Sequence, residues 1–391
     1  MTIPESITMH VPNGKELSVP ENVTLTNEGS IVTDGAITNA GTIINAEAAN
    51  WQNEGVVANT TTGEIYNEGS LNNTFGQIDN VGLVGGEGTI ENENGVITSM
   101  VGILQNQIRN GSNGQIVSEA SWNEDGKKYY GPMDEAFESA INNTDEEVTI
   151  TVEKNYSIDE DLTIPEHVIL NIPANKTLTV PEGVVLDNNG EIIESGTLQV
   201  DGDLETDTSW TDGQTKHYAD LNTALNKVEA GENITLLEDI TWNEDTVLEI
   251  PQDVDLVVPN DVVFEIDEEK LVNPENVKSE ASWKGDDFPN NVSFGALKEA
   301  IEESASNSES NVEVIIRDEV VVEEDLIIPE NVNVKIPEDA TLTISEGVVV
   351  QNNGSVEVDG EFNQEGTFNT EATWKDGTTD FYGTFKEAID V

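Results

Sequence analysis

Cysteine is absent from the 391-residue chain and basic residues are scarce: 16 Lys and Arg face 78 Asp and Glu, a formal charge of −62. Without cysteine the chain has no disulfide, thiolate metal site or cysteine nucleophile. The few cations exclude a nucleic-acid binder, because phosphate contacts need clustered Lys and Arg. The same charge disfavours docking on anionic lipid.

Long apolar runs are absent as well. No stretch of about 18 apolar residues occurs, which excludes direct membrane insertion through a spanning helix. The opening residues, MTIPESITMH, lack the basic-then-apolar build of a signal peptide. The charge alone would suggest disorder, but Val148, Ile150 and Val152 alternate with threonine. Such period-two alternation predicts strands with one buried face.

Internal repeats are the strongest pattern in the sequence. Copies of one pattern occupy residues 2–35, 162–202, 248–266 and 326–360. Within the second copy, Pro165, Pro173 and Pro181 are eight residues apart, and the glycines at 190, 196 and 202 are six apart. We interpret each interval as one short strand and a corner, with glycine supplying positive φ at the corners. Hairpins would fit this spacing too, but repetition of identical steps favours coils stacked along an axis.

A second, tryptophan-bearing module precedes the coils. It occupies residues 119–141, 208–225, 280–301 and 372–389. In one copy Leu221, Ala224, Leu225 and Val228 share a face, which predicts an amphipathic helix with Gly231 beyond its end. We expect the aromatic residues of this module to pack the helix onto the first coil.

In residues 224–236 (ALNKVEAGENITL) a predicted helix is followed by Gly-Glu-Asn and then by an apolar strand. This order resembles the start of pectin-lyase-like right-handed parallel β-helices. Residues 136–152 and 299–316 depart from that pattern by losing the glycine. The whole unit also resembles tandem modules of bacterial and archaeal cell-surface proteins. The resemblance implies an all-β fold of right-handed parallel β-helix (solenoid) modules, with short amphipathic capping helices between them. It implies a fold and no activity.

These patterns predict five segments. They are coils without an N-terminal cap (1–117), a cap helix with a β-helix module (118–206), a cap helix with a shorter degenerate module (207–279), a third cap and module (280–370), and the cap of a following or neighbouring unit (371–391). Residues 36–117 are rich in Asn and Gly with single aliphatic anchors. We expect thin coils there, with asparagine stacking along one edge; a flexible linker is the alternative.

Acidic corners are the candidate cation sites. The predicted Ca²⁺ ligands precede equivalent strands; they are Asp159, Glu160, Asp161, Glu244, Asp245, Glu323, Glu324 and Asp325. Carboxylate oxygens suit Ca²⁺. Solvated turns that maintain solubility and discourage edge pairing are the alternative. No other cofactor is expected.

Catalytic residues are not predicted. Arg109 and Arg317 stand beside carboxylates or on polar faces, which indicates ion pairs rather than a lyase base. The three histidines, His10, His167 and His217, occupy different repeat positions and show no zinc-ligand spacing. Chance pairs among 78 carboxylates carry little information about a hydrolase.

The chain opens inside a repeat and closes on a cap module. Either it is a segment of a longer array, or the last module of one copy caps the coils of the next, an open heterologous contact. The residues expected at such a contact are Trp374, Phe381, Tyr382, Phe385, Ala388 and Ile389.

Taken together, the patterns predict a non-catalytic extracellular or cell-surface protein. We expect an acidic solenoid serving as adhesin stalk, surface-layer component or head-to-tail fibre subunit. Its partners would be further copies or a glycan or other cell-surface ligand. A polysaccharide lyase or hydrolase and a phage tail fibre are the alternatives.

Overall fold

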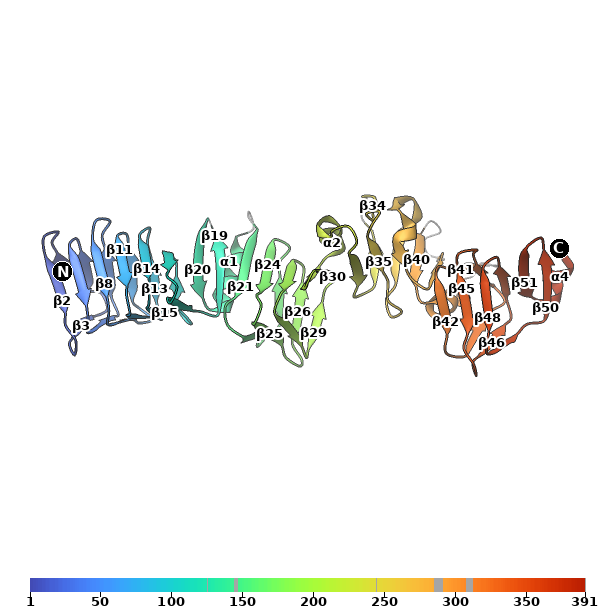
Figure 1. Ribbon diagram of the computed structural model, residues 1–391, viewed down its shortest axis with the longest axis horizontal. Helices are drawn as coiled ribbons and strands as arrows, with labels where there is room; N and C mark the ends of the chain where they lie inside the picture. The colour runs from blue at the N-terminus through green and yellow to red at the C-terminus, as the bar shows by residue number, and fades with distance from the viewer. Residues whose placement is uncertain (125, 144–146, 244, 285–290, 307–311, 391) are drawn as a thin grey trace. The chain divides into compact units, whose positions relative to one another are not determined.

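The computed structural model describes residues 1–124, 126–143, 147–243, 245–284, 291–306 and 312–390 (Figure 1). The chain forms two compact units, Met1–Glu205 and Thr206–Val391. Both units are built mainly from short parallel strands with a few short helices, which confirms the predicted solenoid. No helix in the described ranges is long and apolar enough to cross a membrane.

The first unit begins with coils of three strands each, and every strand pairs in parallel with the strand one coil on. One sheet contains β1 Thr2–Ile3, β4 Thr24–Asn27, β7 Thr42–Asn45, β10 Glu64–Asn67, β13 Leu83–Gly85 and β16 Ile103–Leu104. The second contains β2 Thr8–Val11, β5 Ser30–Thr33, β8 Asn50–Asn53, β11 Ser70–Asn73, β14 Thr89–Asn92 and β17 Gln107–Asn110. The third contains β3 Glu16–Val19, β6 Ala36–Asn39, β9 Val56–Asn59, β12 Gln77–Asn80, β15 Val96–Thr98 and β18 Gln115–Val117.

A cap module and further coils complete the first unit. The cap is a hairpin, β19 Ala120–Glu124 with β20 Lys127–Gly131, followed by helix α1 Met133–Asn142. The coils that follow contain β21 Val148–Val152, β24 Val168–Ile172 and β27 Glu191–Glu194 in one sheet, β22 Tyr156–Ser157, β25 Thr177–Val180 and β28 Thr197–Val200 in another, and β23 Leu162–Ile164, β26 Val185–Asn188 and β29 Asp203–Glu205 in the third.

The second unit starts with another cap module. It contains β30 Thr208–Asp212, β31 Thr215–Ala219 and helix α2 Leu221–Lys227. The coils contain β32 Asn233–Leu236, β35 Asp255–Val257 and β38 Val277–Lys278, then β33 Ile240–Trp242 with β36 Phe264–Asp267, and β34 Leu248–Glu249 with β37 Leu271–Val272. Two 3₁₀ turns, Glu268–Lys270 and Pro274–Asn276, flank β37.

The remaining cap modules and coils follow the same plan. The third cap contains β39 Ala281–Trp283, β40 Asn291–Gly295 and α3 Leu297–Ser306. Its coils contain β41 Val312–Ile316, β44 Val332–Ile336 and β47 Ser355–Val358; β42 Glu319–Val322, β45 Thr341–Ile344 and β48 Glu361–Gln364; and β43 Leu326–Ile328, β46 Val349–Asn352 and β49 Thr367–Asn369. The fourth cap contains β50 Ala372–Asp376, β51 Thr379–Gly383 and α4 Phe385–Asp390.

The tryptophan-bearing module is a β-hairpin followed by a helix, not a helix alone as the sequence predicted. The helix itself is confirmed where its face was predicted: Leu221 and Ala224 are buried, and Leu225 and Val228 pack against the core. The tryptophan lies on the first hairpin strand and is buried; in the first module Trp122 lies opposite Ile150 of β21.

The corner glycines at 190, 196 and 202 are required by close packing rather than by backbone angle. A Cβ on Gly190 would lie 2.4 Å from the carbonyl oxygen of Pro165, one coil earlier. Gly196 meets Pro173 and Gly202 meets Pro181 in the same way, at 2.3 Å and 2.4 Å. None of these three glycines has a positive φ, so the predicted reason for them is wrong. Positive φ occurs one coil earlier, for example at Gly183.

Asparagine forms ladders in residues 27–110, and the linker alternative is wrong. Strands there repeat an aliphatic–x–Asn pattern in which both the aliphatic residue and the asparagine point inward. Within each ladder the Nδ2 of one asparagine donates to the Oδ1 of the asparagine one coil later. The steps are Asn27 to Asn45 to Asn67, Asn39 to Asn59 to Asn80, and Asn53 to Asn73 to Asn92 to Asn110, all at 2.7–2.9 Å. Three ladders therefore line the coils, where the sequence predicted one.

Candidate functional site

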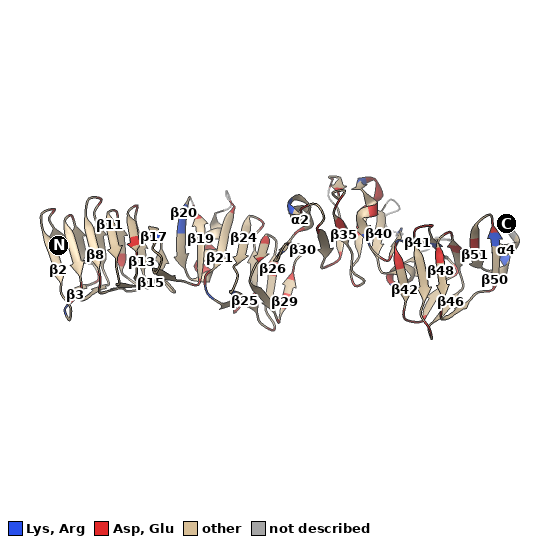
Figure 2. Cartoon of the chain, viewed as in Figure 1, with Lys and Arg blue, Asp and Glu red and all other residues tan. Residues whose placement is uncertain are grey.

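The predicted acidic corners lie on exposed turns before β23, β34 and β43. Asp159, Glu160, Asp161, Asp245, Glu323, Glu324 and Asp325 are all exposed, whereas Glu244 lies outside the described residues. Figure 2 shows that acidic residues occur throughout both units and that Lys and Arg are few.

Two of these carboxylates serve the fold directly. The Asp161 carboxylate accepts a hydrogen bond from the Val185 backbone N–H at 2.9 Å, and Asp325 accepts one from Val349 at 2.8 Å. The same contact joins Asp239 to the N–H of Val263 at 2.8 Å, although the sequence did not single out Asp239. Each carboxylate thus satisfies the N–H that precedes or opens a strand one coil later, which would otherwise lack a ladder partner.

A hollow of about 560 Å³ in the second unit lies beside the third acidic corner. Its walls include Glu323, Glu324 and Asp325 together with Lys298 of α3. Lys298 Nζ lies 3.1 Å from Glu324 Oε2, so one carboxylate of the corner already has a cationic partner. Among the described residues no group of three or more His, Asp or Glu is arranged to hold a metal ion. Calcium binding stays a prediction.

The histidines and arginines lie in separate places. His10 contacts Asp34 at 2.7 Å, His167 donates from Nε2 to the Ala140 carbonyl, and His217 stacks on a tryptophan ring. Arg109 pairs with Glu91 at 2.9 Å on the surface.

Arg317 contacts backbone carbonyls and an aromatic ring. Its Nη2 donates to the carbonyls of Pro274 and Val277, and its guanidinium lies over the Phe294 ring. Burial lowers the pKa of Arg317, while nearby Asp339 acts in the opposite direction. The arrangement joins a coil to a cap hairpin.

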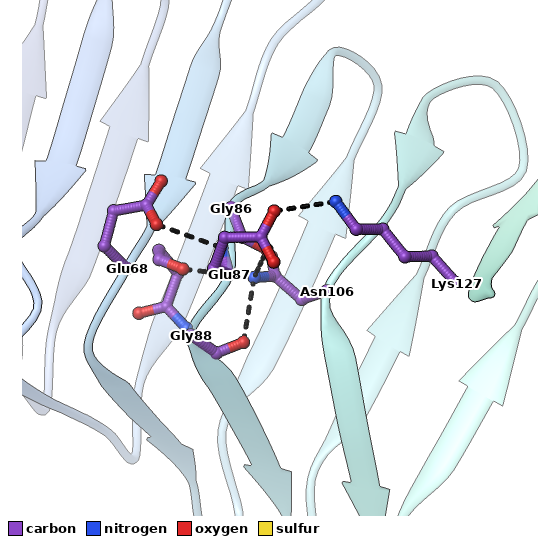
Figure 3. A network of polar contacts seen from close by, with 7 residues as sticks. Glu68, Gly86, Glu87, Gly88, Asn106 and Lys127 are labelled. Carbon is purple, nitrogen blue, oxygen red and sulfur yellow. Dashed lines mark hydrogen bonds and ion pairs between the residues drawn. The ribbon is translucent and has the colours of Figure 1, made fainter. Parts of the chain in front are cut away.

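Asn106 fills a break in one asparagine ladder, where Gly86 replaces the expected asparagine (Figure 3). Its Nδ2 donates to the carbonyls of Asn67, Gly86 and Gly88 at 3.1–3.2 Å. Beside it Lys127 of the cap hairpin pairs with Glu87 at 2.7 Å. Gly86, Glu87, Asn106 and Lys127 line a hollow of about 390 Å³ where the coils meet the first cap.

An acidic residue caps the helix of every cap module, a feature the sequence analysis missed. The carboxylate comes just before the hairpin and accepts a hydrogen bond from the first backbone N–H of the helix. The pairs are Glu119 with Met133, Asp207 with Leu221, Glu280 with Leu297, and Glu371 with Phe385, at 2.9–3.3 Å. The carboxylate satisfies an unpaired N–H and complements the positive end of the helix dipole.

The first three cap modules are covered by the strand that follows their helix. The outer hairpin strand pairs antiparallel with it, as β19 with β21, β30 with β32 and β39 with β41. The module tryptophans Trp122, Trp210 and Trp283 are consequently only 2–4% exposed. On α3, Leu297 and Ile301 are 3% and 2% exposed.

The fourth cap module carries the residues predicted for assembly. Phe385 and Ile389 are 66% and 79% exposed, although they correspond to Leu297 and Ile301 of α3. Ala388 and Trp374 are half-buried, and Trp374 stacks on Phe381 with ring centroids 5.5 Å apart. Tyr382 points toward the preceding coil, where it meets Phe362 and Phe368 edge-on. Tyr382 therefore anchors the hairpin to the preceding coil.

Comparison with known proteins gives no relative: no family model matches the chain, and neither a curated protein nor a solved structure matches it.

Proposed function

We propose that the chain is a non-catalytic structural protein of the cell exterior, in which stacked coils act as a stiff spacer. The role would be that of an adhesin stalk, a surface-layer component or a fibre subunit. The observation that carries this proposal is the asparagine ladder system, because buried polar side chains contact equivalent side chains of the next coil. Hydrogen bonds in such ladders strengthen one another and so favour the stacking of one coil on the next.

The contacts of the charged residues support the same role. Carboxylates of the described residues cap helices, satisfy strand N–H groups or pair with the few cations, as shown above. The remaining acidic surface favours solubility and repels other copies. We further propose that the coils belong to the right-handed, pectin-lyase-like kind found in tandem-repeat surface proteins.

The proposal is tested by activity and location. The 391-residue chain, with and without Ca²⁺, is incubated with acidic and neutral glycans, and unsaturated products and reducing sugars are measured. We expect neither product, while antibody against the chain labels intact cells of the source organism and a cytoplasmic marker remains unlabelled. Glycan cleavage, or labelling only after lysis, would refute the proposal.

A further inference from the structure

The hollow of about 390 Å³ beside the first cap hairpin lies entirely within the first unit. Three segments meet around it: the corner before β14, the corner before β17, and the hairpin strand β20 (Figure 3). Its volume falls within the range of about 300–1,000 Å³ that small-molecule sites occupy. The side chains that line it decide what kind of molecule it can hold.

Two glycines keep the hollow open. Gly86 stands where the repeat has an asparagine, and its φ is +115°, whereas Gly126 turns the hairpin with a φ of +71°. A Cβ on Gly86 would lie 2.4 Å from the carbonyl oxygen of Asn67, so the backbone there requires glycine. The space is therefore built into the backbone and no side chain from these two positions fills it.

Asn106 lines the hollow and has a hydrogen-bond acceptor without a donor. The residue is 3% exposed, and its Nδ2 donates to three backbone carbonyls. Its Oδ1 has no hydrogen-bond partner among the described residues. In a regular rung the asparagine of the coil before would donate to this oxygen, but that coil has Gly86. A buried acceptor without a donor is costly, so a hydroxyl or N–H group that reaches it from the hollow is favoured.

Two glutamine amides line the hollow from the side of the coils. Gln105 is half-buried and lies close to Gly85, since a Cβ on that glycine would be 3.6 Å from the Gln105 Oε1. Gln107 is exposed, and its Oε1 accepts a hydrogen bond from Thr89 at 3.3 Å. Within the described residues neither glutamine Nε2 has an acceptor. An amide offers both a donor and an acceptor, which suits a ligand with hydroxyl groups.

The charges around the hollow disfavour a charged ligand. Lys127 and Lys128 of β20 repel a cation. Glu87, which pairs with Lys127 at 2.7 Å, and the chain's charge of −62 repel an anion. A neutral ligand avoids both penalties and can still hydrogen-bond to the charged groups.

We propose that this hollow binds a neutral saccharide, as one or two sugar rings of a longer glycan. Each sugar hydroxyl both donates and accepts hydrogen bonds, which matches the glutamine amides, the Glu87 carboxylate and the Lys128 ammonium group. A hydroxyl that points inward supplies the donor that the Asn106 Oδ1 lacks. The glycan is held and not cleaved. The inference rests on the proposed role at the cell exterior, where the chain would meet glycans.

The test is binding of the 391-residue chain to immobilised short oligosaccharides of glucose, galactose, mannose and N-acetylglucosamine, with galacturonate oligosaccharides beside them. We expect binding to a neutral oligosaccharide and none to galacturonate. In calorimetry with the neutral oligosaccharide that binds, Gln105→Ala and Gln107→Ala should each raise the Kd about three- to tenfold, because each removes a hydrogen bond between neutral groups. Lys128→Ala should weaken binding as well.

Matched controls separate the hollow from the rest of the surface. Gln115→Ala, at the exposed start of β18, and Lys15→Ala, at an exposed corner, lie outside the hollow and should bind like the parent. Circular dichroism should show the same strand content in all variants.

A parent chain that binds no neutral oligosaccharide, or binds galacturonate alone, would overturn the inference. Binding that is unchanged in both glutamine variants would show that the saccharide lies elsewhere and would equally exclude this hollow. The scaffold role is judged by glycan cleavage and by cell labelling, so a failure to bind here leaves that proposal standing. Cleavage of a glycan would refute the scaffold role without removing the site.

Discussion

Replacing Asn73 with alanine tests whether the asparagine ladders stabilise the coils. Asn73 is fully buried; its Oδ1 accepts from Asn53 at 2.7 Å and its Nδ2 donates to Asn92 at 2.8 Å. The substitution removes both hydrogen bonds, each worth about 1 kcal/mol net. It also leaves the Asn92 Oδ1 buried without its donor, which costs about 1–3 kcal/mol more. We expect a local destabilisation of about 3–5 kcal/mol.

Asn72→Ala is the matched control on the same strand. Asn72 points outward, where its Nδ2 contacts Asn50 at 2.9 Å on an exposed surface. Its removal should change stability by about 0.5 kcal/mol or less. The pair thus compares the same chemical change at adjacent positions on the two faces of β11.

Hydrogen exchange read by mass spectrometry is the suitable assay, because coils of a solenoid open locally rather than all together. Peptides covering β8, β11 and β14 should lose protection on the order of 10²- to 10³-fold in Asn73→Ala, since about 1.4 kcal/mol is tenfold. Peptides of the second unit should be unchanged. Equal effects of the two substitutions would refute a stabilising role for the ladder.

Three further predictions concern capping and pH. Asp325→Ala should destabilise the second unit by about 1 kcal/mol in urea unfolding, since Val349 loses its acceptor, and Glu323→Ala at the same corner should be nearly neutral. Glu280→Ala should cost about 1–2 kcal/mol because α3 loses its N-terminal acceptor, with Glu280→Gln intermediate; equal stability of all three chains would contradict the capping role. Burial, and then the charge of Asp380, raises the pKa of the Tyr382 phenol in the folded chain. The stability that this shift contributes is complete below the pKa of the unfolded chain, near 10, and is lost as the pH rises through the pKa of the folded chain. Ultraviolet titration of the parent against Tyr382→Phe should show this phenol ionising at a higher pH than an exposed tyrosine, and a titration midpoint at or below that of an exposed tyrosine would contradict the prediction.

The sequence predicted those features that depend on local periodicity. Alternation in strands such as Val148–Val152 and the spacing of Leu221 and Ala224 are set by strand and helix geometry, so both patterns can be recognised in the sequence alone. The solenoid class followed from repetition of these local signals.

Features that depend on the neighbouring coil were missed or misread. The hairpin of the cap module did have a local signal, a glycine with positive φ in its tight turn (Gly126, Gly213 and Gly377), but the pairing of Trp122 with Ile150 of the following coil is a contact that no local pattern reports. Gly190 is needed because Pro165 lies against it from the coil before, which spacing alone does not show. The aliphatic–x–Asn repeat was a usable signal. It places an asparagine at the same position of each strand, so a coil of three strands implies three asparagine ladders.

The role of the acidic corners also depends on contacts with a neighbouring coil, which the sequence does not reveal. Equivalence along the repeat pointed to a shared role for Asp161 and Asp325, and their shared role is a hydrogen bond to a strand one coil later. Asp239 has this role without standing at the predicted corner of its module. Composition gave the charge of these positions but could not give their partners.

Every ladder amide donates from the earlier coil and accepts in the later one, so the ladders have a direction. When Asn73 is lost, Asn53 of the earlier coil keeps its bond to the Gln77 carbonyl, whereas Asn92 of the later coil keeps its bonds to Asn110 and Gln115 but has a buried Oδ1 without a donor. Loss of one asparagine therefore leaves an unpaired buried acceptor in the following coil and not in the preceding one.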